Sequence, residues 1–122
     1  MKIVIVFFLI LLSACSKKEE KIPRDVMLSK AMTYDPELKI VIPSNIKEGV
    51  HCTDYGPGCV GGHTVVHKNL PFIVVEFDSE ENARKEAIRV KQFYSKNWLF
   101  DDVKNEPPLE KFVVDVYQAV SP

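Results

Sequence analysis

An apolar segment that leads directly into an amphipathic segment places the strongest constraint on how this chain folds. Residues 72–77 read Phe-Ile-Val-Val-Glu-Phe, which is typical of a buried strand. Asp78 follows, and Glu81 comes three residues later, which is the spacing of a helix-capping box. The pattern therefore predicts a strand joined to a long helix over residues 79–97. The apolar residues on one face of this predicted helix are Ala83, Ala87, Val90, Tyr94 and Trp98.

A second apolar segment near the C-terminus extends this prediction. Pro107 and Pro108 prevent the helix from continuing, and residues 112–117 read Phe-Val-Val-Asp-Val-Tyr, typical of a closing strand. A strand, a helix and a strand in this order predict a right-handed β-α-β unit with parallel strands over 72–77 and 112–119.

Shorter segments supply the rest of the expected fold. Residues 38–42 and 64–67 are β-branched and predict further strands, and residues 25–32 predict a short helix with Asp25 as its cap. We therefore expect an α+β two-layer sandwich in which one long helix covers a sheet of three or four strands. The segment from Val75 to Ala83 is similar to the strand-to-helix step of many such domains, which implies a partial ferredoxin-like arrangement.

The first 15 residues have the layout of an export signal. Lys2 is followed by an unbroken apolar run over residues 3–12, which is too short for a transmembrane helix and suits a secretory signal. The sequence Leu12-Ser13-Ala14-Cys15 resembles the lipobox of bacterial lipoproteins. The resemblance implies cleavage before Cys15 and acylation of Cys15 with diacylglycerol and palmitate-type chains, which anchor a protein firmly to a bilayer.

This resemblance divides the chain into three parts. Residues 1–14 are the expected signal peptide, residues 15–24 the lipidated N-terminus and polar tether, and residues 25–122 a single small α+β domain. Ser16, which is not Asp, implies the periplasmic face of the outer membrane if the organism has two membranes. We expect the protein in the cell envelope, with membrane contact through its lipid.

The most distinctive segment of the domain holds both remaining cysteines and all three histidines. His51, Cys52, Cys59, His63 and His67 lie within residues 51–67, in a glycine-rich region that predicts a long loop over 43–63. Once Cys15 is acylated, an even number of cysteines remains in an oxidising compartment. A turn at Gly-Pro-Gly between the two cysteines favours a disulfide.

A metal site is the alternative use of the same residues. Cys52 and Cys59 with two of His51, His63 and His67 would suit zinc. The gap between the cysteines is longer than in most zinc sites, and His63 and His67 would lie about 13 Å apart on a strand. The disulfide is therefore the leading prediction, with no cofactor, and a periplasmic metal-binding domain is the alternative function.

The remaining features argue against an enzyme and against a nucleic-acid-binding protein. The chain has 16 Lys and Arg against 17 Asp and Glu, so it lacks the basic surplus that phosphate contacts require. The sequence has no nucleophile elbow, phosphate-binding loop or His-Glu-x-x-His motif. Trp98, Leu99 and Phe100 are consecutive, and one of them is a candidate for an exposed partner surface. We therefore expect a non-enzymatic lipoprotein that binds an envelope protein partner or supports an assembly.

Overall fold

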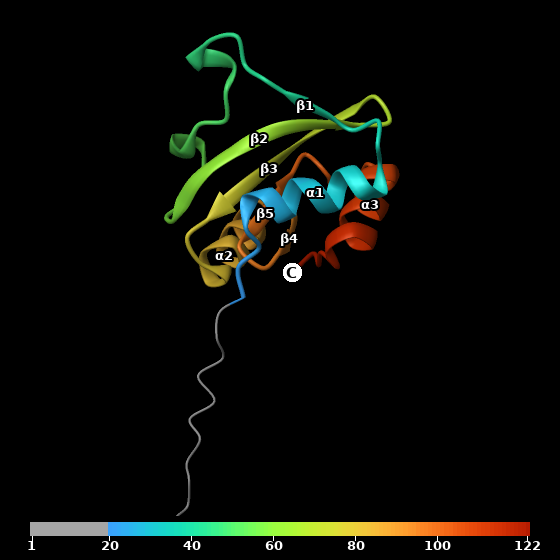
Figure 1. Ribbon diagram of the computed structural model, residues 1–122. Coiled ribbons are helices and arrows are strands. Elements are labelled where there is room, and N and C mark those ends of the chain that lie inside the picture. Colours follow the sequence, from blue (N-terminus) through green and yellow to red (C-terminus); the bar gives the residue numbers. More distant parts are fainter. Residues whose placement is uncertain (1–19) are drawn as a thin grey trace, which may run out of the picture.

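The computed structural model describes residues 20–122, so the predicted signal peptide and Cys15 lie outside the described residues. Three α-helices and a five-stranded sheet form the described part (Figure 1). The elements in chain order are α1 (Arg24–Tyr34), β1 (Lys39–Val41), the 3₁₀ helices η1 (Ile46–Glu48) and η2 (Cys52–Asp54), β2 (Cys59–His67), β3 (Leu70–Phe77), α2 (Glu80–Val90), β4 (Phe93–Ser95), β5 (Trp98–Asp101) and α3 (Pro107–Tyr117).

The sheet has the strand order β1-β2-β3-β5-β4, and every neighbouring pair is antiparallel. Lys68 and Asn69 connect β2 to β3 with φ angles of 49° and 65°, the left-handed conformation that a two-residue hairpin turn requires. Because β5 is antiparallel to both β3 and β4, those two strands are parallel to each other. The unit β3-α2-β4 is therefore a β-α-β unit with β5 inserted between its two strands.

Hydrophobic side chains cover both faces of the sheet. Alternate residues of β3 and β5 point to opposite sides, so Val74 and Phe100 face α1 and α3, whereas Val75 and Leu99 face α2. Figure 1 shows α1 and α3 together on one side of the strands and α2 apart from them. The sandwich thus has a helix layer on each side of the sheet.

Phe112 of α3 is the centre of the larger core. Its ring contacts the rings of Tyr34, His67, Phe72 and Tyr117, with centroid distances between 4.4 and 6.3 Å. These four rings come from α1, β2, β3 and α3 itself. One side chain therefore joins elements that are far apart in the sequence.

The predicted helix over 79–97 is about half as long in the structure. Ser79 caps α2 by accepting a hydrogen bond from the Asn82 backbone N–H at 3.1 Å, so the cap is one residue after the predicted Asp78. The helix ends at Lys91, which has a φ of 58°. The next residues form the hairpin of β4 and β5. Ala83 and Ala87 are buried on one side of α2, as predicted, but Trp98 lies on strand β5.

The predicted strand over 112–119 is wrong, because this segment belongs to helix α3. Pro107 and Pro108 occupy its first turn, where a missing backbone N–H costs nothing. The β-α-β prediction is corrected accordingly: its second strand is β4, not residues 112–119. The buried residues of α3 have helical spacing and are Leu109, Phe112, Val113, Val116 and Tyr117.

The α+β class is confirmed, whereas several details differ. The sheet has five strands instead of three or four, and helices on both of its faces give three layers instead of two. The short helix expected over 25–32 is α1, which begins at Arg24, so Asp25 lies in its first turn and is not its cap. Three helices of 11 residues are present where one short and one long helix were expected. The ferredoxin-like topology is not confirmed. The loop expected over 43–63 is shorter because β2 begins at Cys59, with an irregular register between Cys59 and Gly61.

The first described residues are fixed to the β4–β5 hairpin. The Ile22 N–H donates to Asn97 Oδ1 and the Trp98 indole N–H donates to the Ile22 carbonyl, both at 2.8 Å. Asn97 is held in turn by donating to the Phe77 carbonyl at 3.2 Å. Ile22 is therefore held against the folded domain by backbone and side-chain hydrogen bonds.

Candidate functional site

A disulfide joins Cys52 and Cys59, which is the pairing expected from the sequence. The two Cα atoms are 5.4 Å apart, and the bond connects η2 to the start of β2. Gly58 has a φ of 89°, and a Cβ atom there would lie only 2.4 Å from the Asp78 side chain and 2.5 Å from Asn82. Glycine is therefore required for the loop to close against the start of α2.

Polar contacts hold the disulfide loop against α2 and β5. The Gly56 N–H donates to the buried Glu86 carboxylate, which also pairs with Arg89. Burial alone would raise the pKa of Glu86, but hydrogen bonds from Arg89 and Gly56 outweigh it and leave this pKa below its ordinary value. The Tyr55 hydroxyl donates to Asp101 at 2.8 Å. Burial, with this hydrogen bond, raises the pKa of Tyr55.

The three histidines do not meet in one place. His67 is 4% exposed, and its Nδ1 lies 2.7 Å from Asp35 at the end of α1. His63 is half-buried on β2, where burial and the nearby Arg24 lower its pKa. His51 precedes η2. Each histidine therefore has a separate environment.

The metal alternative receives no support from this arrangement. The sulfur atoms of Cys52 and Cys59 are bonded to each other, so neither is a thiolate that could bind zinc. Across residues 20–122, no group of three or more His, Cys, Asp or Glu side chains is placed to hold a metal ion.

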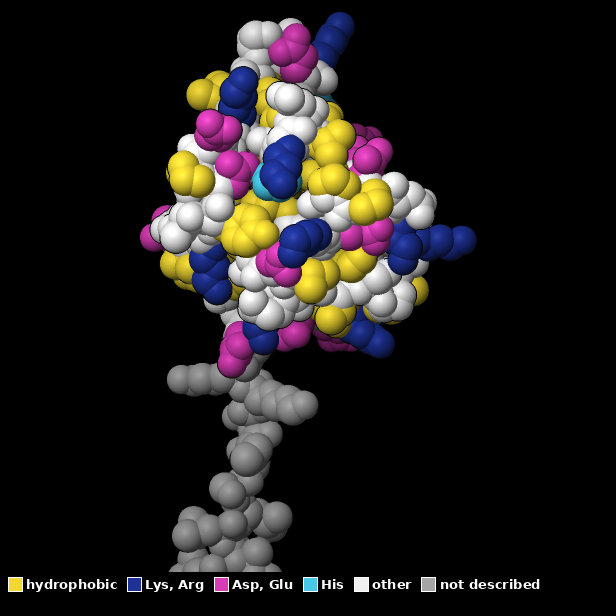
Figure 2. All heavy atoms as spheres, turned by 90° about the vertical axis from the view of Figure 1, so that its right-hand side faces the viewer, with side chains coloured by type: hydrophobic (Ala, Val, Ile, Leu, Met, Phe, Trp, Pro, Cys, Tyr) yellow, Lys and Arg dark blue, Asp and Glu magenta, His cyan; other side chains and the backbone are white. Residues whose placement is uncertain are grey.

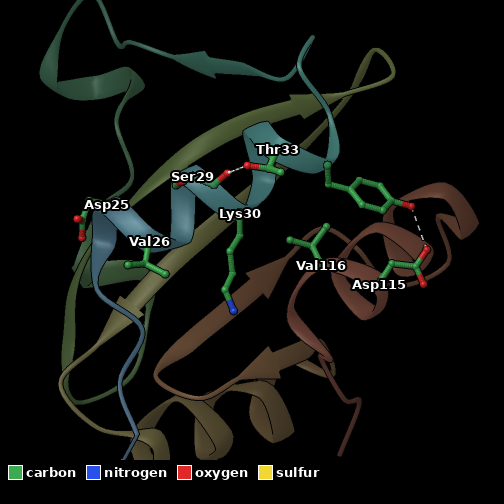
Figure 3. A pocket seen from close by; sticks show the side chains of 8 residues that line it. Asp25, Val26, Ser29, Lys30, Thr33, Asp115 and Val116 are labelled. Atoms are coloured by element: carbon green, nitrogen blue, oxygen red, sulfur yellow. Dashed lines mark hydrogen bonds between the residues drawn. The ribbon is translucent and has the colours of Figure 1, made fainter.

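A groove between α1 and α3 was not predicted from the sequence. Its volume is about 620 Å³ (Figure 3). One face of α1 forms a wall, with residues at helical spacing, and the last turns of α3 form the other. The lining residues are Asp25, Val26, Ser29, Lys30, Thr33, Tyr34, Asp115 and Val116.

Charged groups in the groove differ in how they are paired. Asp115 accepts hydrogen bonds from Lys111 at 2.7 Å and from the Tyr34 hydroxyl at 3.0 Å, and these two contacts lower its pKa. The side chain of Lys30 extends into the space between Val26 and Val116 (Figure 3). Within the part of the chain that the structure describes, the groove thus contains the paired carboxylate of Asp115, a second carboxylate at Asp25 and the amine of Lys30.

The groove has the chemistry of a binding surface. The Thr33 hydroxyl donates to the Ser29 carbonyl at 2.8 Å, so it is occupied within α1. Asp115 accepts from the Tyr34 hydroxyl and from Lys111, and among the described residues of the groove no carboxylate hydrogen-bonds to the hydroxyl of Ser29 or Thr33. The groove thus offers apolar side chains, hydrogen-bonding groups, the Asp25 carboxylate and the Lys30 amine.

The surface at the α3 end of the domain carries both hydrophobic and charged side chains. Figure 2 shows hydrophobic side chains scattered among charged ones, with no single large apolar patch on this face. The expectation that Trp98, Leu99 or Phe100 is exposed is wrong, because all three are at most 1% exposed. They occupy β5, which has strands on both sides and helices over both faces.

Two further results bear on the protein as a whole. Among residues 20–122 there is no helix with the length and apolarity that crossing a membrane requires. Comparison with protein-family models, with curated proteins and with solved structures found no match to this chain.

Proposed function

We propose that this chain is a non-enzymatic lipoprotein of the cell envelope whose small domain binds a protein partner through the groove between α1 and α3. The observation that carries the proposal is the groove itself, which offers apolar side chains together with the Lys30 amine and the Asp25 carboxylate. In an organism with two membranes, the periplasmic face of the outer membrane is the expected location.

The anchor rests on the lipobox-like sequence that ends at Cys15. Ile22 is held to Asn97 and Trp98 by hydrogen bonds, so only the residues between 15 and 22 separate the lipid from the folded domain. A fully extended chain of this length spans at most ~25 Å. The groove would therefore lie close to the membrane surface, where an envelope protein partner is within reach.

Replacement of the anchoring residue tests the first half of the proposal. Cys15→Ser should abolish acylation and cleavage before residue 15, because serine has no thiol to receive the glyceride. Intact mass of the protein would measure both, with Lys17→Ala as the matched control. Normal cleavage of Cys15→Ser before residue 15 would refute the anchor.

Site-specific crosslinking tests the second half. A photoreactive residue at Thr33, inside the groove, should give a discrete adduct with another protein in intact cells. The same residue at Arg84, on exposed α2 surface, is the control and should not give that adduct. Lys30→Glu should weaken the Thr33 adduct, because it reverses the charge in the groove. Equal adducts at both positions would contradict a role for the groove.

A further inference from the structure

The pairing between β1 and β2 stops well before the end of β2. Strand β3 pairs with β2 from Cys59 to His67, whereas β1 reaches only from Thr64 to Val66. After Val41 the chain leaves the sheet and returns to β2 through η1 and η2, and Figure 1 shows this connection standing away from β2. The first half of β2 therefore has a neighbouring strand on one side only.

The register of the sheet shows where the backbone groups of this open edge point. The Phe77 N–H donates to the carbonyl of Asn97, just before β5, so Phe77 and every second residue before it on β3 point their backbone groups toward β5. Val75 is one of these residues, and it lies opposite Gly62 of β2. The N–H and carbonyl of Gly62 therefore point away from β3, toward the open edge.

Gly62 is also the next position with which β1 would pair. Val41 lies opposite Thr64, so the same register would place Pro43 opposite Gly62. Proline has no N–H to donate to the Gly62 carbonyl, which explains why the pairing ends there. Within residues 20–122, no group outside the sheet ladders forms a hydrogen bond with the backbone of Gly62.

A cleft lies beside this unpaired backbone position. Its volume is about 210 Å³, which is smaller than the ~300 Å³ at which pockets for cofactors and drug-sized ligands begin. Apolar side chains of the connection form one wall, and β2 forms the other. Gly62 is partly exposed, so a ligand in the cleft can reach it. The lining residues are Val41, Pro43, Glu48, Gly49, Val50, Gly62, His63 and Thr64.

We propose that this cleft binds an extended peptide segment of another protein, which pairs with β2 where β1 has left it. One residue of the peptide donates its N–H to the Gly62 carbonyl and accepts from the Gly62 N–H, antiparallel to β2 as β1 is. Small apolar side chains of the peptide contact Val41, Pro43 and Val50. An extended main chain supplies a donor and an acceptor at the spacing that this edge requires. The site goes beyond the proposed function, because it shares no lining residue with the α1–α3 groove and does not depend on the anchor.

Amide hydrogen exchange on the purified full chain tests the open edge directly. His63 and Val65 lie opposite Val74 and Phe72, whose backbone groups point toward β2, so their N–H groups should exchange slowly. The Gly62 N–H lies between them in the sequence and should exchange about tenfold faster or more. A Gly62 N–H that exchanges as slowly as those of His63 and Val65 would overturn the proposal.

Crosslinking in intact cells tests for the partner. A photoreactive residue at Ile42, which is 87% exposed and adjacent to two lining residues, should form one adduct with a different protein. Thr64→Phe fills the cleft and should lower the adduct yield about tenfold, because the peptide loses its hydrogen bonds to β2. Thr53→Phe, at an exposed threonine of η2, is the matched control and should leave the yield unchanged. Gly49→Leu is a second blocking variant, since the nearest atoms to an added Cβ are 3.7 Å away.

A synthetic peptide with the crosslinked sequence of the partner tests the mode of binding. When it is added to the purified chain, exchange of the Gly62 N–H should slow about tenfold, because this group gains an acceptor. Exchange of the Ala87 N–H, inside α2, should not change. Binding of the peptide without protection of Gly62 would show that the contact is not strand pairing and would overturn the proposal.

Three outcomes of the crosslinking would also overturn the proposal. The first is the absence of an adduct at Ile42, and the second is an adduct with twice the mass of this chain, which would identify a second copy. The third is an adduct that persists in Thr64→Phe and Gly49→Leu when their melting temperatures show that both are folded. Crosslinking from Thr33 reports on the α1–α3 groove separately, so failure of one site is distinguishable from failure of the other.

Discussion

Removal of the disulfide should cost this domain a large part of its stability. Cys52 and Cys59 are 7 positions apart in the sequence, so the bond closes a loop of about eight residues. In the chain-entropy relation, a loop of this size restricts the unfolded chain enough to stabilise the native state by about 2.5 kcal/mol at 25 °C. For a domain of roughly 100 residues, that loss lowers the melting temperature by about 10–20 °C.

Urea unfolding of a matched pair of proteins measures this loss. Both proteins carry Cys15→Ser, so neither is acylated, and one also carries Cys52→Ala and Cys59→Ala. We expect the urea midpoint to fall. The dependence of the free energy of unfolding on urea should change little, because the crosslink restricts only about eight residues of the unfolded chain. A loss below about 0.5 kcal/mol would refute the reasoning, since the unfolded chain would then gain almost no freedom.

Substitution of Glu86 separates two effects of the disulfide: restriction of the unfolded chain, and docking of the loop between Cys52 and Cys59 against α2. The Gly56 N–H and Arg89 bind its carboxylate, which is 3% exposed, and Gly56 lies inside the loop that the disulfide closes. Glu86→Gln should therefore destabilise both proteins. The effect should be smaller by about 0.5–1 kcal/mol without the disulfide, because the loop then docks less completely. Equal effects in the two backgrounds would show that the crosslink and the docking contacts act independently.

Three further predictions follow from single residues. Gly58→Ala should destabilise the domain by about 1–3 kcal/mol in urea unfolding, because its φ of 89° and the nearby Asp78 leave no room for a Cβ atom; no loss would contradict this geometry. Phe112→Ala should cost about 3–5 kcal/mol, since it removes the ring that four other rings contact, and a loss below 1 kcal/mol would refute its central role. The hydrogen bond from His67 lowers the pKa of Asp35. The contribution of this bond to the stability of the folded domain is therefore complete at a pH above the ordinary carboxyl pKa, and it is lost as the pH falls through the lowered pKa of Asp35. Asp35→Asn should therefore flatten the acid side of the stability profile, and an unchanged profile would contradict the pairing.

The parts of the fold that were predictable have strong local signals. The run 72–77 is a strand because β-branched and aromatic residues fill both faces of a central strand. The cysteine pair was predictable because an even number of cysteines remains once Cys15 is set aside, and glycines allow the turn between them. Both inferences use residues that are close together in the sequence.

The errors arose where one pattern fits two structures. Ala83, Ala87, Val90, Tyr94 and Trp98 keep a helical period even though the last two residues are on strands. The decisive feature is Trp98-Leu99-Phe100, since three consecutive apolar residues can all be buried only on an element that is covered on both faces. Lys91 in the left-handed conformation ends α2, and lysine is not a residue that signals such an ending.

The same ambiguity concealed the candidate site. Phe112, Val114 and Val116 alternate as in a strand, but Val114 is exposed, and the buried set Leu109, Phe112, Val113 and Val116 follows the helical period instead. Two adjacent prolines were interpreted as blocking a helix, although they are equally suited to its first turn. Once residues 107–117 are a helix, it must bury its apolar face against the sheet beside α1. The groove follows from that placement, because two helices on one face of a sheet leave a hollow lined by their outward-facing polar residues. Val26 and Val116 are 90 positions apart, so no local pattern could have brought them together.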